Sequence, residues 1–172
     1  MNTPRSHVLI KSLQQQEGPN WCYSAVVQAI IQYYKNIEIP QSNIARTIAQ
    51  INKNNNMECM RDPYTFLQDN GYISSTFKKK SISWEVITSN INEGYPIIIR
   101  VAKHYAIISG YSINPTIGNQ ILILDPILPN GGPVAMLHSV FNKHGLQTDY
   151  EHTGKPVYER MNGYILTDRP TS

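Results

Sequence analysis

Cysteine is scarce in this sequence, whose 172 residues include only Cys22 and Cys59. Two cysteines are too few for a disulfide-stapled scaffold, and their separation matches no four-ligand zinc motif. Charged residues are also scarce, at 16% of the chain against the roughly 25% typical of soluble proteins, while hydrophobic residues reach 41%. The composition therefore predicts a globular protein, and the length suits a single domain over residues 1–172.

Long hydrophobic runs are absent as well. The longest apolar stretch, residues 95–111, is interrupted by Arg100, Lys103 and His104, so it lacks the roughly 20 clean apolar residues of a membrane-spanning helix. The N-terminal residues show no apolar core followed by a small-residue cleavage site, which would mark a signal peptide. We expect a soluble protein that is cytoplasmic or is exported without a cleavable signal peptide.

Signals for nucleic acids, nucleotides and metals are missing too. The net charge of +3 is mild, and the basic run at 78–80 has no interleaved aromatic residues. No glycine-rich phosphate loop occurs. The spacing of His138, His144, His152 and Asp149 matches no short zinc motif, and we interpret these histidines as surface residues. We expect no nucleic-acid or membrane partner, no metal and no cofactor.

Helical periodicity fills the first half of the sequence. Apolar spacing predicts helices at about 22–34, from a cap at 40–42 to 51, at 63–70 after a cap at Asp62, and at 84–92. Ser83 is the expected N-cap of the last of these helices, and Gly94 follows its end.

Strand patterns fill the second half. Runs rich in β-branched residues predict antiparallel strands at 97–101, 105–111, 120–124 and, in two pieces, 157–167. Residues 134–143 are expected to form a short helix that ends at Gly145, and 147–155 an exposed loop. The predicted fold class is α+β, with an N-terminal helical layer (about 14–94) packed against a C-terminal antiparallel sheet (about 95–168).

Cys22 stands where an irregular Gly-Pro-Asn loop at 18–20 enters the first predicted helix. The positive end of the helix dipole and the backbone N–H groups at that place favour a thiolate. Free cysteine is also among the most buried residue types. From the first half of the chain alone, a nucleophile and a small buried hydrophobe are equally good interpretations of Cys22.

His104 begins an apolar strand, and Asp125 follows the end of the next one. In a hairpin that turns near residues 114–115, the two side chains are expected to lie opposite each other at the open end. A carboxylate beside an imidazole fixes its tautomer and stabilises the imidazolium. Each residue alone has an ordinary structural explanation. Together with Cys22, the pair indicates nucleophilic catalysis with a base and an orienting acid.

These motifs resemble those of the papain-like cysteine peptidases. The shared features are a glutamine six residues before the cysteine, a helix of small residues after it, and the later runs Gly-Tyr-Pro-Ile, His-Tyr-Ala-Ile-Ile-Ser-Gly-Tyr and Ile-Leu-Ile-Leu-Asp-Pro. The resemblance covers about residues 14–126, with weaker similarity to residue 145. The sequence is most similar to compact bacterial branches: peptidases that cut bacteriocin precursors after double-glycine leaders, and effector proteases that pathogens deliver into host cells.

The resemblance implies a papain-like fold and a cysteine endopeptidase in which Cys22 is the nucleophile, His104 the base and Asp125 the orienting acid. It also implies that the side-chain amide of Gln16 helps to form the oxyanion hole, although only spacing selects Gln16 from a run of three glutamines. We interpret Trp21 as a wall of the substrate cleft. The aspartate at position 125 replaces the asparagine of many larger papain relatives and is shared by the compact bacterial branches.

Two other functions fit the same residues: an acyl or amide transferase, in which an amine acceptor outcompetes water, and a binding module that keeps the fold without turnover. We interpret Cys59 as structural or incidental, because no histidine stands near it at ligand spacing. The implied partner is a protein or peptide, either a host protein or a secreted precursor. The lack of an attached transporter domain favours a bacterial effector with a role in virulence.

Overall fold

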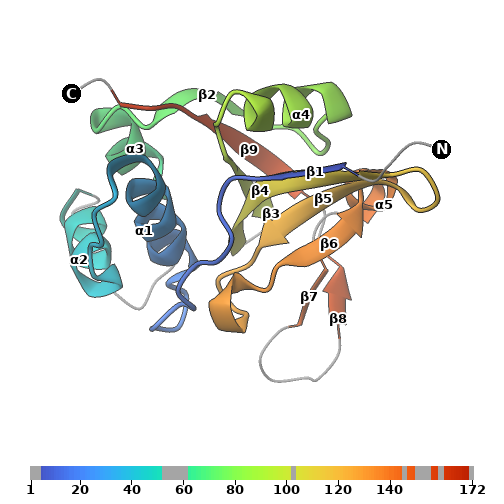
Figure 1. Ribbon diagram of the computed structural model, residues 1–172. Coiled ribbons are helices and arrows are strands. Elements are labelled where there is room, and N and C mark those ends of the chain that lie inside the picture. Colours follow the sequence, from blue (N-terminus) through green and yellow to red (C-terminus); the bar gives the residue numbers. More distant parts are fainter. Residues whose placement is uncertain are drawn as a thin grey trace.

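The structure is a computed structural model that describes residues 5–51, 62–101, 104–144, 147–149, 156–158 and 161–170 (Figure 1). The helices are α1 (Cys22–Lys35), α2 (Gln41–Ile51), α3 (Tyr64–Asp69), α4 (Trp84–Asn92) and α5 (His138–His144), with a short 3-10 helix η1 (Pro129–Gly131). The strands are β1 (Arg5–Val8), β2 (Ile73–Phe77), β3 (Ile97–Val101), β4 (His104–Asn114), β5 (Gly118–Leu124), β6 (Val134–Leu137), β7 (Gln147–Asp149), β8 (Pro156–Tyr158) and β9 (Met161–Thr167).

The main sheet is antiparallel, and within the described ranges it has seven strands. The order is β2-β9-β3-β4-β5-β6, and β1 pairs with the part of β4 that extends past β3. β7 and β8 form a separate two-stranded sheet. The predicted α+β class is confirmed, as are helices α1 to α4 and the strand runs of β3, β4, β5, β8 and β9. Ser83 caps α4 as expected, since its side chain accepts a hydrogen bond from the backbone N–H of Val86.

Several segments differ from the sequence predictions. β1 precedes the part that was expected to be helical (about 14–94), and β2 lies within it. Neither was expected as a strand, yet they pair with β4 and β9. Both strands carry polar residues at exposed positions, so neither has the β-branched run that the sequence pattern requires. The prediction of a helix at 134–143 is wrong for its first part. Residues 134–137 form strand β6, which pairs with β5, and the helix α5 begins only at His138. The first part of the loop expected at 147–155 is strand β7, which pairs with β8. Gly145, the expected end of the preceding helix, lies outside the described residues.

The main sheet is buried on both faces. In β3, Ile98 packs in the cluster that α1, α2 and α3 cover, while Ile97 and Ile99 pack in the cluster under α4 and α5. Ile107 and Ile108 of β4 divide between the two faces in the same way. A strand that is buried on both sides needs a continuous apolar run, which explains why these strands show no polar alternation. Figure 1 shows α1, α2 and α3 together at one side of the sheet, with α4 on another.

Candidate active site

Cys22 is the first residue of α1, and 2% of it is exposed. The first ten residues of this helix are buried, because the segment carries no charged side chain before Lys35. Trp21 occupies the N-cap position and gives the helix no side-chain cap. The thiol therefore lies at the N-terminal, positive end of a buried helix dipole.

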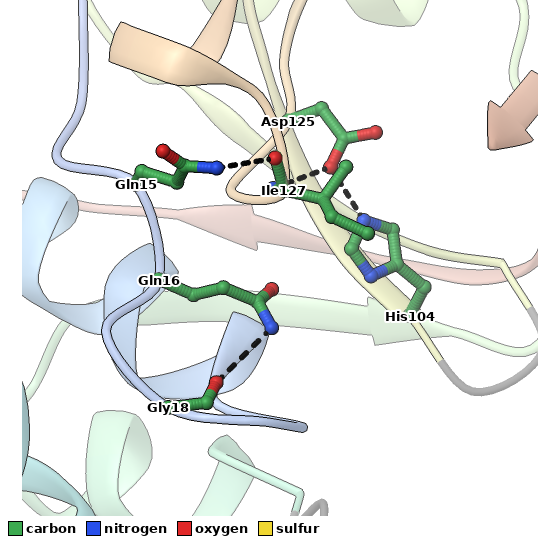
Figure 2. A network of polar contacts seen from close by, with 6 residues as sticks. All are labelled: Gln15, Gln16, Gly18, His104, Asp125 and Ile127. Atoms are coloured by element: carbon green, nitrogen blue, oxygen red, sulfur yellow. Dashed lines mark hydrogen bonds and ion pairs between the residues drawn. The ribbon is translucent and has the colours of Figure 1, made fainter. Parts of the chain in front are cut away.

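His104 and Asp125 form a buried pair at the end of the β4–β5 hairpin. Nε2 of His104 lies 2.6 Å from Oδ1 of Asp125, and the two residues are 7% and 2% exposed (Figure 2). The same carboxylate oxygen accepts a hydrogen bond from the Ile127 N–H at 3.1 Å. The backbone N–H of Asp125 donates to the Gly131 carbonyl at 2.9 Å. The turn after β5 thus fixes the carboxylate that holds the imidazole.

The hairpin register differs from the sequence prediction. Asn114 pairs with Gly118, and a bulge between Ile108 and Gly110 shifts the ladder by one residue. At the last pair, Ile107 lies opposite Leu124, so His104 stands beyond the position that faces Asp125. The prediction that the two residues lie directly opposite each other is therefore wrong. The imidazole reaches the carboxylate diagonally across the hairpin.

The imidazole of His104 also contacts Cys22. Burial lowers the pKa of the ring, but hydrogen bonds to Asp125 and Cys22, with the charges of these two groups, outweigh burial and raise the pKa from 6.5 to about 10. Because Asp125 occupies Nε2, Nδ1 is the nitrogen left for the thiol. The imidazolium is therefore the favoured form at neutral pH.

The loop that carries Gln16 runs beside the turn after Asp125. The backbone N–H of Gln16 donates to the Pro126 carbonyl at 2.8 Å, and Nε2 of Gln15 donates to the Ile127 carbonyl at 2.8 Å. These bonds join the start of the helical layer to the end of β5. They bring Gln16 to the same part of the molecule as the His104–Asp125 pair (Figure 2).

The side chain of Gln16 extends toward His104 (Figure 2). One N–H of its amide donates to the Gly18 carbonyl at 3.2 Å, which leaves the second N–H of Nε2 available to another acceptor. The amide oxygen is buried and has no hydrogen-bond partner among the described residues. Trp21 is half-buried and packs over Gly18, where an added Cβ would lie 2.6 Å from the indole. The indole also packs against the α1 core cluster, so a packing role accompanies the predicted role as a cleft wall.

Sequence reasoning missed Gln41, which holds the loop around Gln16. Gln41 begins α2 and is fully buried. Its Oε1 accepts from the Glu17 N–H at 3.0 Å, and its Nε2 donates to the Gln15 carbonyl and to Oε1 of Gln28, each at 3.1 Å. Gln41 therefore bonds the chain on both sides of Gln16. No sequence signal marks it, since a glutamine at a helix start is ordinarily exposed.

The remaining sequence candidates do not join this site in the described structure. Nε2 of His138 lies 2.7 Å from the Ile82 carbonyl oxygen, a packing contact of α5. Cys59, His152 and the side chains of His144 and Asp149 lie outside the described residues. In the part of the chain that the structure describes, no three His, Cys, Asp or Glu residues gather as a metal site. None of the described helices has the length and apolarity to cross a membrane.

Fold and site together define a class of protein. A helix that begins with a buried cysteine packs on an antiparallel sheet that carries a His–Asp pair, and this is a papain-like α+β architecture. The chain belongs to the Peptidase_C39 like family, which it matches over residues 9–163. A comparison with curated proteins found no match. Family membership supports cysteine peptidase activity, a hydrolase function, in general terms.

Replacing Asp125 with Asn should lower the pKa of His104 from about 10 toward 6.5, because the carboxylate charge is lost. A raised native pKa stabilises the fold fully below pH 6.5, and this contribution is lost as the pH rises toward 10. In urea unfolding, the free energy of unfolding of Asp125→Asn should therefore fall less between pH 6.5 and pH 10 than that of the native protein. NMR titration of His104 measures the pKa directly, with Asp69→Asn, an exposed carboxylate, as control. A wild-type His104 that titrates near 6.5 would contradict this account.

Replacing Gln41 with Leu should destabilise the fold by about 2–4 kcal/mol, because it leaves several buried polar groups without partners. Hydrogen exchange at the Glu17 N–H should also become faster. The matched control is Gln50→Leu, which changes an exposed glutamine of the same helix. Equal urea stability and equal exchange in both variants would show that Gln41 does not hold the loop.

Proposed function

We propose that the protein is a thiol endopeptidase that cleaves peptide bonds through an acyl-enzyme on Cys22. One observation carries the proposal: buried His104 contacts Cys22 and Asp125, and its pKa is raised by both contacts. This arrangement supplies a nucleophile, a proton donor and an orienting carboxylate in one place. Membership of the Peptidase_C39 like family supports the general activity.

In the proposed reaction, the Cys22 thiolate attacks the carbonyl carbon of the scissile peptide bond. The new S–C bond forms as the carbonyl electron pair moves to oxygen. The backbone N–H of Cys22 and the second N–H of the Gln16 amide donate to this oxyanion. His104 gives its proton to the amide nitrogen as the C–N bond breaks, which releases an amine and leaves a thioester on Cys22.

Deacylation reverses the proton path. Neutral His104 takes a proton from water while the water oxygen attacks the thioester carbonyl. Loss of the carboxylic acid restores the Cys22 thiolate and the His104 imidazolium. Throughout the cycle, Asp125 holds Nε2 of the ring, so that Nδ1 stays directed to the reacting atoms. Trp21, next to the nucleophile, is proposed to form part of the cleft wall.

The test is cleavage of a mixed peptide library, with new termini identified by mass spectrometry. Cys22→Ala should abolish cleavage, about a thousandfold or more, and leave thermal stability nearly unchanged, because it removes a nucleophile without which the acyl-enzyme cannot form. His104→Ala should also abolish cleavage, but it should lower the free energy of unfolding by about 3–5 kcal/mol, because it leaves the buried Asp125 carboxylate without its partner. Gln14→Ala is the control, because Gln14 is exposed and bonds Glu38 instead.

Product masses separate the alternatives. A fragment that gains one water molecule indicates hydrolysis, whereas a fragment that gains an amine indicates an acyl or amide transferase. Cleavage by Cys22→Ala equal to that of the native protein would overturn the proposal. No reaction by the native protein would favour a binding module. Action on a host protein, as an effector, stays a prediction.

A further inference from the structure

A second feature lies beside the proposed active site: a pocket of about 320 Å³ on the face of the sheet that α1, α2 and α3 cover. Tyr105, which directly follows His104, lines it. Burial and the charges of Asp62 and Cys22 raise the pKa of the Tyr105 phenol, while Arg100 lowers it. Tyr105 and Cys22 pack in the same buried cluster, and the Arg100–Tyr105 pair is next to the Val101–His104 pair in the sheet, so the pocket lies near the proposed active site. Its volume is at the lower end of the range for ligand pockets, roughly 300–1,000 Å³.

Strand register explains which residues of the sheet line the pocket together. Tyr105 of β4 pairs with Arg100 of β3, and Arg100 pairs with Gly163 of β9. Lys78 follows β2 on the far side of Gly163. A Cβ added to the glycine would meet the Phe77 carbonyl oxygen at 3.0 Å and the Lys78 Cα at 4.0 Å, so the backbone of β2 packs directly against Gly163. Arg100 and Lys78 lie on either side of Gly163, and both cations line the pocket.

Tyr64, the first residue of α3, and Asp62, two residues before it, also line the pocket. The Asp62 carboxylate accepts a hydrogen bond from the Tyr64 N–H at 2.9 Å and is also bonded to the Tyr105 hydroxyl. Two cations and one carboxylate line the pocket, so its formal charge is +1. Arg100 lies over the Tyr105 ring at 5.9 Å from the ring centroid. Its guanidinium has five N–H donors, so Arg100 can bind a substrate carboxylate in addition to its protein contacts.

We infer that this pocket receives an acidic side chain, Glu or Asp, of the peptide substrate, and that Arg100 and Lys78 bind its carboxylate. This inference rests on the proposed function, since the pocket is useful only if a peptide lies at Cys22. A carboxylate bound in the pocket between Arg100 and Lys78 has a cation on either side. The aromatic ring of Tyr64 and the apolar Ile165 contact the methylene groups that precede the carboxylate.

The test uses peptidyl epoxides that differ in one side chain, Glu or Gln, at the first or second residue before the epoxide. Intact-protein mass spectrometry measures the rate of Cys22 alkylation. At one of the two positions, the Glu probe should react about tenfold faster than the Gln probe, as a charge-assisted hydrogen bond predicts. Arg100→Gln and Lys78→Gln should each reduce this preference severalfold. Lys80→Gln removes the same charge from an exposed residue outside the pocket and should leave the preference unchanged.

Each outcome decides between the two proposals. Equal rates for Glu and Gln probes, or a preference that survives Arg100→Gln and Lys78→Gln, would overturn the acidic pocket and leave the peptidase proposal intact. If Cys22 reacts with iodoacetamide but with none of the peptidyl probes, the acidic pocket is likewise overturned and the peptidase proposal is left intact. A Cys22 that reacts with neither reagent faster than free cysteine would overturn both.

Discussion

The hydrogen bond between His104 and Asp125 is the interaction on which the arrangement of the site depends. Both groups are buried, and an unpaired buried charge would cost several kcal/mol. The bond therefore requires the β4–β5 hairpin, its bulge and the turn at 125–131 to keep their geometry. That requirement explains why Asp125 uses its backbone N–H and a carboxylate oxygen within this turn. The sheet supplies a preorganised base, and the helical layer only has to bring the thiol to it.

The loop at 9–20 joins the two layers. Its backbone N–H groups at Leu9, Leu13 and Gln16 donate to carbonyls of the sheet and of the turn after β5. Gln41 bonds the same loop from α2, and Ser24 of α1 donates to the Gln41 carbonyl at 2.6 Å. The position of Cys22 relative to His104 is thus set by a polar network that reaches both layers. A change in α2 is transmitted to the site through these bonds, although α2 supplies no reacting group.

Local patterns in the sequence predicted most of the elements. The helical spacing of apolar residues after Cys22 predicted α1, and the hairpin signal predicted that His104 and Asp125 meet. The bulge that sets their diagonal contact has no local signal, because it depends on how β4 accommodates β5. β1, β2 and β6 were missed for the same reason: their pairing partners, and not their own residues, make them strands. Gln41 and the Arg100–Gly163–Lys78 row depend on contacts between distant segments, which no spacing in the sequence reveals.

The central claim is that Cys22 and His104 act as one activated pair. Brief treatment with a papain-type epoxide inhibitor at neutral pH, followed by peptide mass spectrometry, tests it most directly. The account predicts that the native protein is labelled at Cys22 and not at Cys59, and that His104→Ala loses this labelling while remaining folded. Labelling of neither cysteine in the native protein, or equal labelling of Cys22 in both proteins, would contradict the account.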